Sequence, residues 1–123
     1  MRVAITGATG NVGTALVRRL VGDDRVTSVL AIARRTPDPA PEPDLGVAAG
    51  TGAGDPTAKV TWVAADVATD DLRPHLDGAD AVVHLAWRFQ PTHRPTATWA
   101  ANAVGSRRVF AAVAEAGVPA LVH

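Results

Sequence analysis

The sequence predicts an α/β protein in which a parallel β-sheet carries helices on both faces. Short apolar runs without polar alternation, such as residues 3–5 and 81–86, are typical of strands that are buried on both sides. Helical segments alternate with these runs, which is the order of a wound parallel sheet. The chain has 123 residues, of which 47% are hydrophobic, enough for a single core. We therefore expect one domain over residues 1–123.

The expected elements follow one another closely at the start of the chain. A strand over residues 3–5 leads into a glycine-rich turn, and a helix over residues 11–21 follows, with Asn11 as its N-cap and Gly22 at its end. The remaining expected elements are strands over 26–33, 59–64 and 81–86, a short helix over 69–76, a long helix over 96–116, and a fifth strand that begins at residue 120. The sequence ends inside that strand, so we expect the sheet to be truncated there.

Residues 36–58 differ in composition from the rest of the chain. This segment contains five prolines and four glycines, which prevent a long regular element. Loops of this length are uncommon inside compact domains. We expect a flexible, exposed, disordered insertion rather than a folded lobe.

Composition excludes several classes of function. Twelve basic and twelve acidic residues cancel, so no net field favours nucleic acid or an anionic membrane as a partner. Cysteine is absent, which excludes disulfides, thiolate metal sites and a cysteine nucleophile. The histidines and carboxylates show no spacing typical of a metal site. No apolar run approaches about 18 residues, and the N-terminus does not resemble a signal peptide. We expect a cytoplasmic globular protein.

The sharpest motif is TGATGNVG at residues 6–13, where three glycines at a spacing of three lie between the first strand and the first helix. The first glycine permits a tight exit from the strand, the second leaves room for a pyrophosphate, and the third lets the helix pack on the strand. The N–H groups at the helix start would hold the phosphates. A glycine-rich turn without a ligand is the alternative, but this position favours cofactor binding. The candidate phosphate-binding residues are Gly7, Thr9, Gly10, Asn11, Val12 and Gly13.

This motif resembles the TGxxGxxG of the extended short-chain dehydrogenase/reductases, the NAD-dependent epimerase/dehydratase family. The sequences DV at 66–67, HLA at 84–86 and NAVGS at 102–106 are similar to further motifs of that family, in the same order, and the last departs mildly from N-V-x-G-T. The resemblance implies a Rossmann-type fold.

The resemblance also implies roles for residues near the later strands. Asp66 and Val67 would contact the adenine, while Leu85 and Ala86 would run beneath the ribose next to the nicotinamide. His84 is either a satisfied core histidine or, less favoured, a catalytic base. The sequence WRFQ at 87–90 follows the fourth strand and either lines a pocket or covers the next helix. We interpret the arginines at 107–108 as the solvated face of the long helix.

Arg34 and Arg35 stand at the end of the second expected strand, where the residue type selects the cofactor. An acid there binds the ribose hydroxyls of NAD, whereas an arginine pairs with the 2′-phosphate of NADP. We therefore expect NADP to be favoured over NAD. Alternatively, both arginines are solvated charges, and Asp38, Glu42 or Asp44 from the following loop supplies the acid.

The catalytic residues of the resembled family have no counterparts in this sequence. The resemblance implies a Tyr-x-x-x-Lys pair on the helix after strand five, in which the Tyr is the acid/base and the Lys lowers the pKa of the Tyr and binds the nicotinamide ribose. This chain contains no Tyr, and Lys59 is its only Lys. We expect the chain to be an inactive cofactor-binding part of a longer epimerase/dehydratase or oxidoreductase, or a truncated product. A small-molecule substrate would bind only to a longer form. A non-catalytic module that senses NADP or binds a protein is the alternative, and the exposed sheet edge predicts a homodimer.

Overall fold

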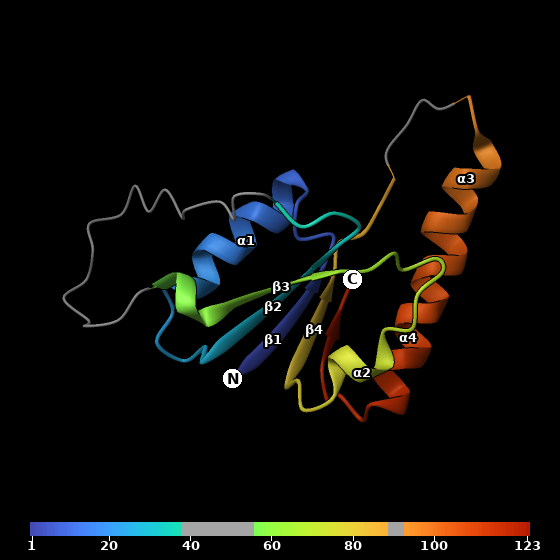
Figure 1. Ribbon diagram of the computed structural model, residues 1–123. Coiled ribbons are helices and arrows are strands. Elements are labelled where there is room, and N and C mark those ends of the chain that lie inside the picture. Colours follow the sequence, from blue (N-terminus) through green and yellow to red (C-terminus); the bar gives the residue numbers. More distant parts are fainter. Residues whose placement is uncertain (38–55, 89–92) are drawn as a thin grey trace.

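The computed structural model describes residues 1–37, 56–88 and 93–123. Five parallel strands form one sheet in the order β3-β2-β1-β4-β5 (Figure 1). The strands are β1 (Arg2–Thr6), β2 (Ser28–Ala33), β3 (Val60–Ala64), β4 (Ala81–His84) and β5 (Leu121–Val122). This arrangement confirms the predicted wound α/β sheet.

Helices cover both faces of the sheet (Figure 1). They are α1 (Asn11–Val21), the 3-10 helix η1 (Pro56–Lys59), α2 (Arg73–Leu76), α3 (Pro95–Trp99), the π-helical segment η2 (Ala100–Val104) and α4 (Gly105–Glu115). The expected long helix is therefore present as α3, η2 and α4 in succession, with a change of hydrogen bonding in its middle. Within the described residues, no helix has both the length and the apolar character needed to span a membrane.

The side chains of the central strand β1 point alternately into two hydrophobic cores, one on each face of the sheet. Val3 and Ile5 of β1 face α1 and pack with Val17. Ala4 faces the opposite side and belongs to the core that contains Val109 of α4. Because successive strand residues point to opposite faces, one short apolar strand supplies both layers.

The bounds of the first helix are as predicted, but its predicted cap and the predicted start of the second helix are wrong, and local hydrogen bonds explain both. Gly10, not Asn11, is the N-cap of α1, because the Gly10 carbonyl accepts the first helical hydrogen bond from the Thr14 N–H at 2.8 Å. The expected helix over 69–76 is shortened to α2. Asp66 and Asp70 instead bind backbone N–H groups in a turn, which competes with helix formation.

Most of the expected loop over 36–58 lies outside the described residues, as do Phe89 and Gln90. The part that is described, from residue 56 onwards, forms the helix η1 and not irregular loop. Proline at its first position explains this, since its fixed φ suits a helix start and its missing N–H is not needed there.

Candidate functional site

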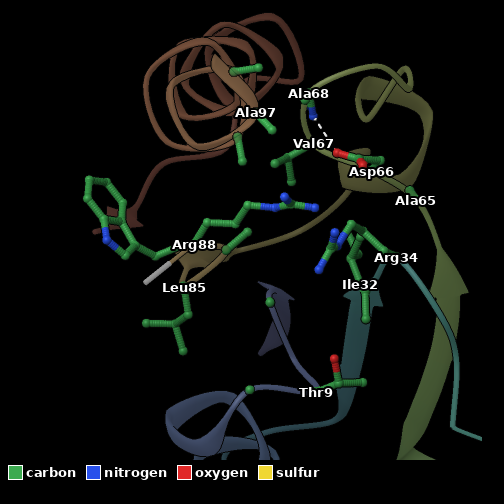
Figure 2. Close-up of a pocket in the computed structure, with 17 residues that line it drawn as sticks. Thr9, Ile32, Arg34, Ala65, Asp66, Val67, Ala68, Leu85, Arg88 and Ala97 are labelled. Carbon is green, nitrogen blue, oxygen red and sulfur yellow. Dashed lines mark hydrogen bonds between the residues drawn. The ribbon is translucent and has the colours of Figure 1, made fainter. Parts of the chain in front are cut away.

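A pocket of about 400 Å³ lies at the carboxyl ends of the strands (Figure 2). The strand order reverses at β1, which has β2 on one side and β4 on the other. Such a switch point is where open α/β sheets bind ligands, and the volume is in the range of small-molecule sites. Eight of the predicted site residues line the pocket: Gly7, Thr9, Gly10, Arg34, Asp66, Val67, Leu85 and Ala86.

The turn after β1 leaves no room for side chains at two of its glycines. Gly7 has a φ of +75°, and a Cβ there would lie 2.6 Å from backbone atoms of Leu85 and Ala86. A Cβ at Gly13 would collide with the carbonyl oxygen of Gly7. These glycines let the turn pack against the segment after β4 and let α1 approach β1.

Gly10 is less crowded than these two glycines, because only one atom lies within 4 Å of a Cβ built there. The nearest atom to a Cβ built there is the Gly7 carbonyl oxygen, at 3.3 Å, and Gly10 itself lines the pocket. The fold therefore tolerates a small side chain at Gly10 better than at the other two glycines of the motif. What a side chain at Gly10 would obstruct is the approach of a ligand to the backbone.

The first turn of α1 offers unused donors beside this opening. The N–H groups of Asn11, Val12 and Gly13 precede the first helical hydrogen bond and have no acceptor in the part of the chain that the structure describes. The helix dipole adds a partial positive charge here. Asn11, Val12 and Gly13 are not among the residues that line the pocket, and neither is Arg35.

The Asp66 turn forms the pocket wall that follows β3. The Asp66 Oδ1 atom accepts a hydrogen bond from the Ala68 N–H at 2.9 Å, and the Asp70 Oδ2 atom accepts one from the Asp66 N–H at 2.8 Å (Figure 2 shows the first). The bond from the Asp66 N–H, and secondly that from the Thr69 hydroxyl, lower the pKa of Asp70.

Arg108 holds the same turn from α4, which corrects its interpretation as a purely solvated residue. Its Nη2 atom donates to the carbonyl oxygens of Asp70 at 2.8 Å and Thr69 at 3.1 Å. Gly105 supports the turn too, since a Cβ there would lie 2.8 Å from the Cγ2 atom of Val67. The helix α4 therefore positions the wall that Asp66 and Val67 form.

His84 is buried at the end of β4 and is satisfied on both ring nitrogens. Its Nδ1 atom lies 2.6 Å from the Thr6 hydroxyl, and its Nε2 atom lies 2.9 Å from the Ser106 hydroxyl. The Ser106 hydroxyl donates to the Asn102 carbonyl oxygen at 2.5 Å, so it must accept from the histidine. His84 therefore carries a proton on Nε2, and it links β1, β4 and α4. Burial, and secondly the charge of His123, lower its pKa to about 4.

Asn102 binds the backbone of the segment after β4 at two points. Its Oδ1 atom accepts a hydrogen bond from the Arg88 N–H at 2.7 Å, and its Nδ2 atom donates to the Arg88 carbonyl oxygen at 2.9 Å. The amide thereby replaces the ladder partner that a strand would have provided. Trp87 and Arg88 both line the pocket, which favours the first of the two alternatives for this segment, lining a pocket over covering the next helix.

Similarity to a known protein family agrees with this geometry. The profile of the NAD dependent epimerase/dehydratase family matches residues 3–123. The chain belongs to this family. An uncharacterised protein of Mycobacterium tuberculosis is 31% identical to it over 124 residues, and the match covers 99% of this chain but 12% of that protein. A Mycobacterium bovis protein, also uncharacterised, matches to the same extent.

Solved structures of similar fold include DesIV, a dTDP-glucose 4,6-dehydratase from Streptomyces venezuelae with NAD and TYD bound. Its TM-score is 0.76 at 24% identity, over 100% of this chain and 38% of that chain. The Bordetella bronchiseptica enzyme WbmG in complex with NAD has a TM-score of 0.72 at 24% identity, over 98% of this chain and 36% of that chain. These likenesses show the fold, and this chain spans less than half of each structure.

The helical wall of the pocket was not predicted from the sequence. Ala97 of α3 and Ala100 and Ala101 of η2 line it. Alanine is common on any helix, so its presence alone indicates no site. The π-helical hydrogen bonding of η2, which contains Ala100 and Ala101, has no sequence signature either, although such segments are frequent at functional sites.

Proposed function

We propose that the chain binds a nicotinamide dinucleotide as the cofactor-binding part of an epimerase/dehydratase or oxidoreductase. One observation carries the proposal. The three unbonded N–H groups at the start of α1 stand beside Gly10, which lines the pocket and has no side chain to block a ligand. A diphosphate needs this combination of donors, positive dipole end and close backbone approach.

The remaining pocket walls suit the other parts of such a cofactor. We propose that Asp66 and Val67 flank the adenine and that Leu85 and Ala86 lie beneath the nicotinamide ribose, because these residues line the same pocket as the glycine turn. When bound, the nicotinamide supplies hydride transfer, and the protein supplies orientation.

We propose further that NADP is preferred over NAD. Arg34 lines the pocket at the end of β2, and no acidic residue among the described residues occupies that strand end. A guanidinium there favours a 2′-phosphate over free ribose hydroxyls. Arg35 lies outside the pocket lining, so Arg34 is the residue to which we assign this preference.

Substrate conversion is proposed to belong to a longer form of the protein. The chain has no Tyr, and Lys59 precedes the amino end of β3, away from the pocket at the carboxyl ends; its Nζ atom donates to the Val21 carbonyl oxygen at 3.3 Å. We expect this chain alone to bind cofactor without catalysis, and to pair with a second copy along the exposed edge at β5.

The proposal is tested by titrating NADP and NAD into the wild-type chain and into Gly10→Val. The valine side chain would fill the space that the diphosphate needs, so we expect affinity to fall on the order of 100-fold, given charge-assisted hydrogen bonds of about 1.5–3 kcal/mol each. Gly22→Ala, at the other end of α1, is the matched control and should bind normally.

Circular dichroism should show the same helical content in all three proteins. Equal affinity of the wild type and Gly10→Val would overturn the assignment of the phosphate site. Tighter binding of NAD than of NADP by the wild type would overturn the cofactor preference alone.

A further inference from the structure

We propose that Arg88 and Arg34 together form a two-guanidinium clamp for a phosphomonoester, the 2′-phosphate of the cofactor, and that Asn102 is the positioning residue that holds Arg88 there. The inference rests on the proposed dinucleotide binding. It adds Arg88 as a second residue that binds the 2′-phosphate and Asn102 as the residue that positions Arg88. Two groups of observations lead to it, one on the side chains in the pocket and one on the backbone behind them.

The two guanidinium groups come from different walls of one pocket. Arg34 follows β2, and Arg88 follows β4, on the far side of β1. Figure 2 shows the Arg88 side chain extending toward Arg34 and the Asp66 turn rather than toward Thr9. Both side chains are thus directed to the part of the pocket beyond the ends of β2 and β3.

Neither guanidinium is neutralised within the part of the chain that is described. The ion pair found there joins Arg25 to Asp23, and the side chains of Arg34 and Arg88 make no hydrogen bond with a described residue. Asp66 is the acidic residue of the pocket lining, and its Oδ1 atom is engaged by the Ala68 N–H. Two positive charges directed into one pocket favour an anion between them. Each guanidinium group can donate two parallel hydrogen bonds to the oxygens of a phosphate.

The position of the clamp separates it from the diphosphate. The donors proposed for the diphosphate are the N–H groups at the start of α1, next to Gly10. Arg34 stands at the end of β2, the strand end that selects between a ribose hydroxyl and a 2′-phosphate. A second guanidinium reaching that end therefore points to the 2′-phosphate as the ligand of the clamp.

The Asn102 amide explains how an exposed residue after a strand keeps a defined position. Beyond His84, the segment after β4 leaves the sheet, and the two hydrogen bonds between Asn102 and the Arg88 backbone hold it. The Asn102 carbonyl oxygen is bound in turn by Ser106, which contacts the buried His84. The backbone of Arg88 is thus connected to the core through hydrogen bonds. Arg88 therefore has less conformational freedom to lose when a phosphate binds.

The experiment uses 2′,5′-ADP and ADP as probes, titrated into the full chain. Only the first carries the 2′-phosphate, while the second carries the diphosphate. We expect Arg88→Gln to weaken 2′,5′-ADP by about tenfold or more and to leave ADP within about twofold. Arg34→Gln should have the same pattern. Arg107→Gln, which removes the same charge from an exposed position on α4 outside the pocket, is the matched control and should change neither affinity.

A double-mutant cycle tests the positioning role. Asn102→Ala should weaken 2′,5′-ADP in the presence of Arg88, and the same change should have no further effect in Arg88→Gln. Additive losses would mean that Asn102 acts on general stability and not through Arg88, and they would overturn its assignment. Circular dichroism of each variant checks that the fold is retained.

The outcomes separate this inference from the proposed function. If Arg88→Gln weakens ADP and 2′,5′-ADP equally, Arg88 serves the diphosphate and the clamp is wrong. If the wild type binds both probes and Arg88→Gln is indistinguishable from it, the clamp fails while dinucleotide binding stands. If the wild type binds neither probe, both are overturned.

Discussion

His84 shows how one residue joins the core to the site. Its ring nitrogens are bonded to Thr6 on β1 and Ser106 on α4, and its ring stacks on that of His123 with centroids 5.0 Å apart. The Ser106 hydroxyl proton is committed to the Asn102 carbonyl oxygen, so the Nε2 atom of His84 donates to Ser106. A histidine committed in this way is a structural link and not a free base.

The lowered pKa of His84 predicts a pH-dependent loss of stability. The unfolded chain takes up a proton near pH 6.5, whereas the folded chain resists protonation until about pH 4. The unfolded state therefore binds more protons within this window, so the contribution of His84 is complete above pH 6.5 and declines as the pH falls toward 4. Urea denaturation at about pH 7 and about pH 5 should show a smaller drop for His84→Gln than for the wild type.

The exposed His93 provides the control for this measurement. His93→Gln should retain the full wild-type drop in stability between the two conditions. If His84→Gln and the wild type lose stability in parallel, the acid sensitivity arises from other groups.

At the scale of elements, close approaches of helices to turns position the site. The helix α1 approaches the turn after β1 at Gly13, and α4 approaches the Val67 side chain of the Asp66 turn at Gly105, each without space for a Cβ. Arg108 adds hydrogen bonds from α4 to the same turn. The helices α1 and α4 therefore hold the glycine turn and the Asp66 turn in place. The shape of each turn depends on these helices as well as on the residues of the turn.

Gly13→Ala is predicted to destabilise the protein. The new Cβ would collide with the backbone of Gly7 and Ala8, which no side-chain rotation can relieve. We expect a loss of about 2–3 kcal/mol in the free energy of unfolding, as for overpacked cores. Gly22→Ala is the matched control, because its Cβ would meet the Arg19 carbonyl oxygen at an ordinary 3.8 Å and should change stability by less than about 0.5 kcal/mol. Urea denaturation measures both, and equal stability of the two variants would contradict the packing argument.

For the whole molecule, β5 is an edge strand of the sheet, because within residues 1–37, 56–88 and 93–123 only β4 pairs with it. Leu121 and Val122 are 37% and 58% exposed, and Phe110 and Trp87 nearby are also exposed. The rings of Phe110 and Trp87 both lie close to that of His123, with centroids 5.5 and 6.3 Å away. An apolar strand with free backbone groups is a template for pairing with another chain.

We therefore expect the chain to self-associate through this edge. Sedimentation velocity should show dimers or larger species whose proportion rises with concentration. Val122→Lys places a charge on the edge and should shift the chain toward monomer, whereas Ala114→Lys adds the same charge to an exposed position on α4 and should not. A wild-type chain that sediments as a single monomeric species would contradict this prediction.

Much of the candidate site could be predicted because its residues carry local signals. Gly7 and Gly10 belong to a motif with a known spacing, and Asp66 follows an apolar run that indicates a buried strand. The contact between Asn102 and Arg88 had no such signal, since the two residues are 14 positions apart and belong to different elements. Asn11 was misassigned as the cap because glycine and asparagine both suit that position.

By itself, the sequence determined the order of strands and helices along the chain, the two-sided burial of β1 and β2 and the place of the glycine turn. Apolar periodicity and glycine spacing are local properties, and a short stretch of chain is enough to express them. Only the tertiary structure decided that Arg34 and Arg88 share one pocket, that Arg108 supports the Asp66 turn, and that an alanine-lined π-helical segment closes the far wall. Those features depend on which segments pack side by side, and that pairing depends on interactions between residues far apart in the chain.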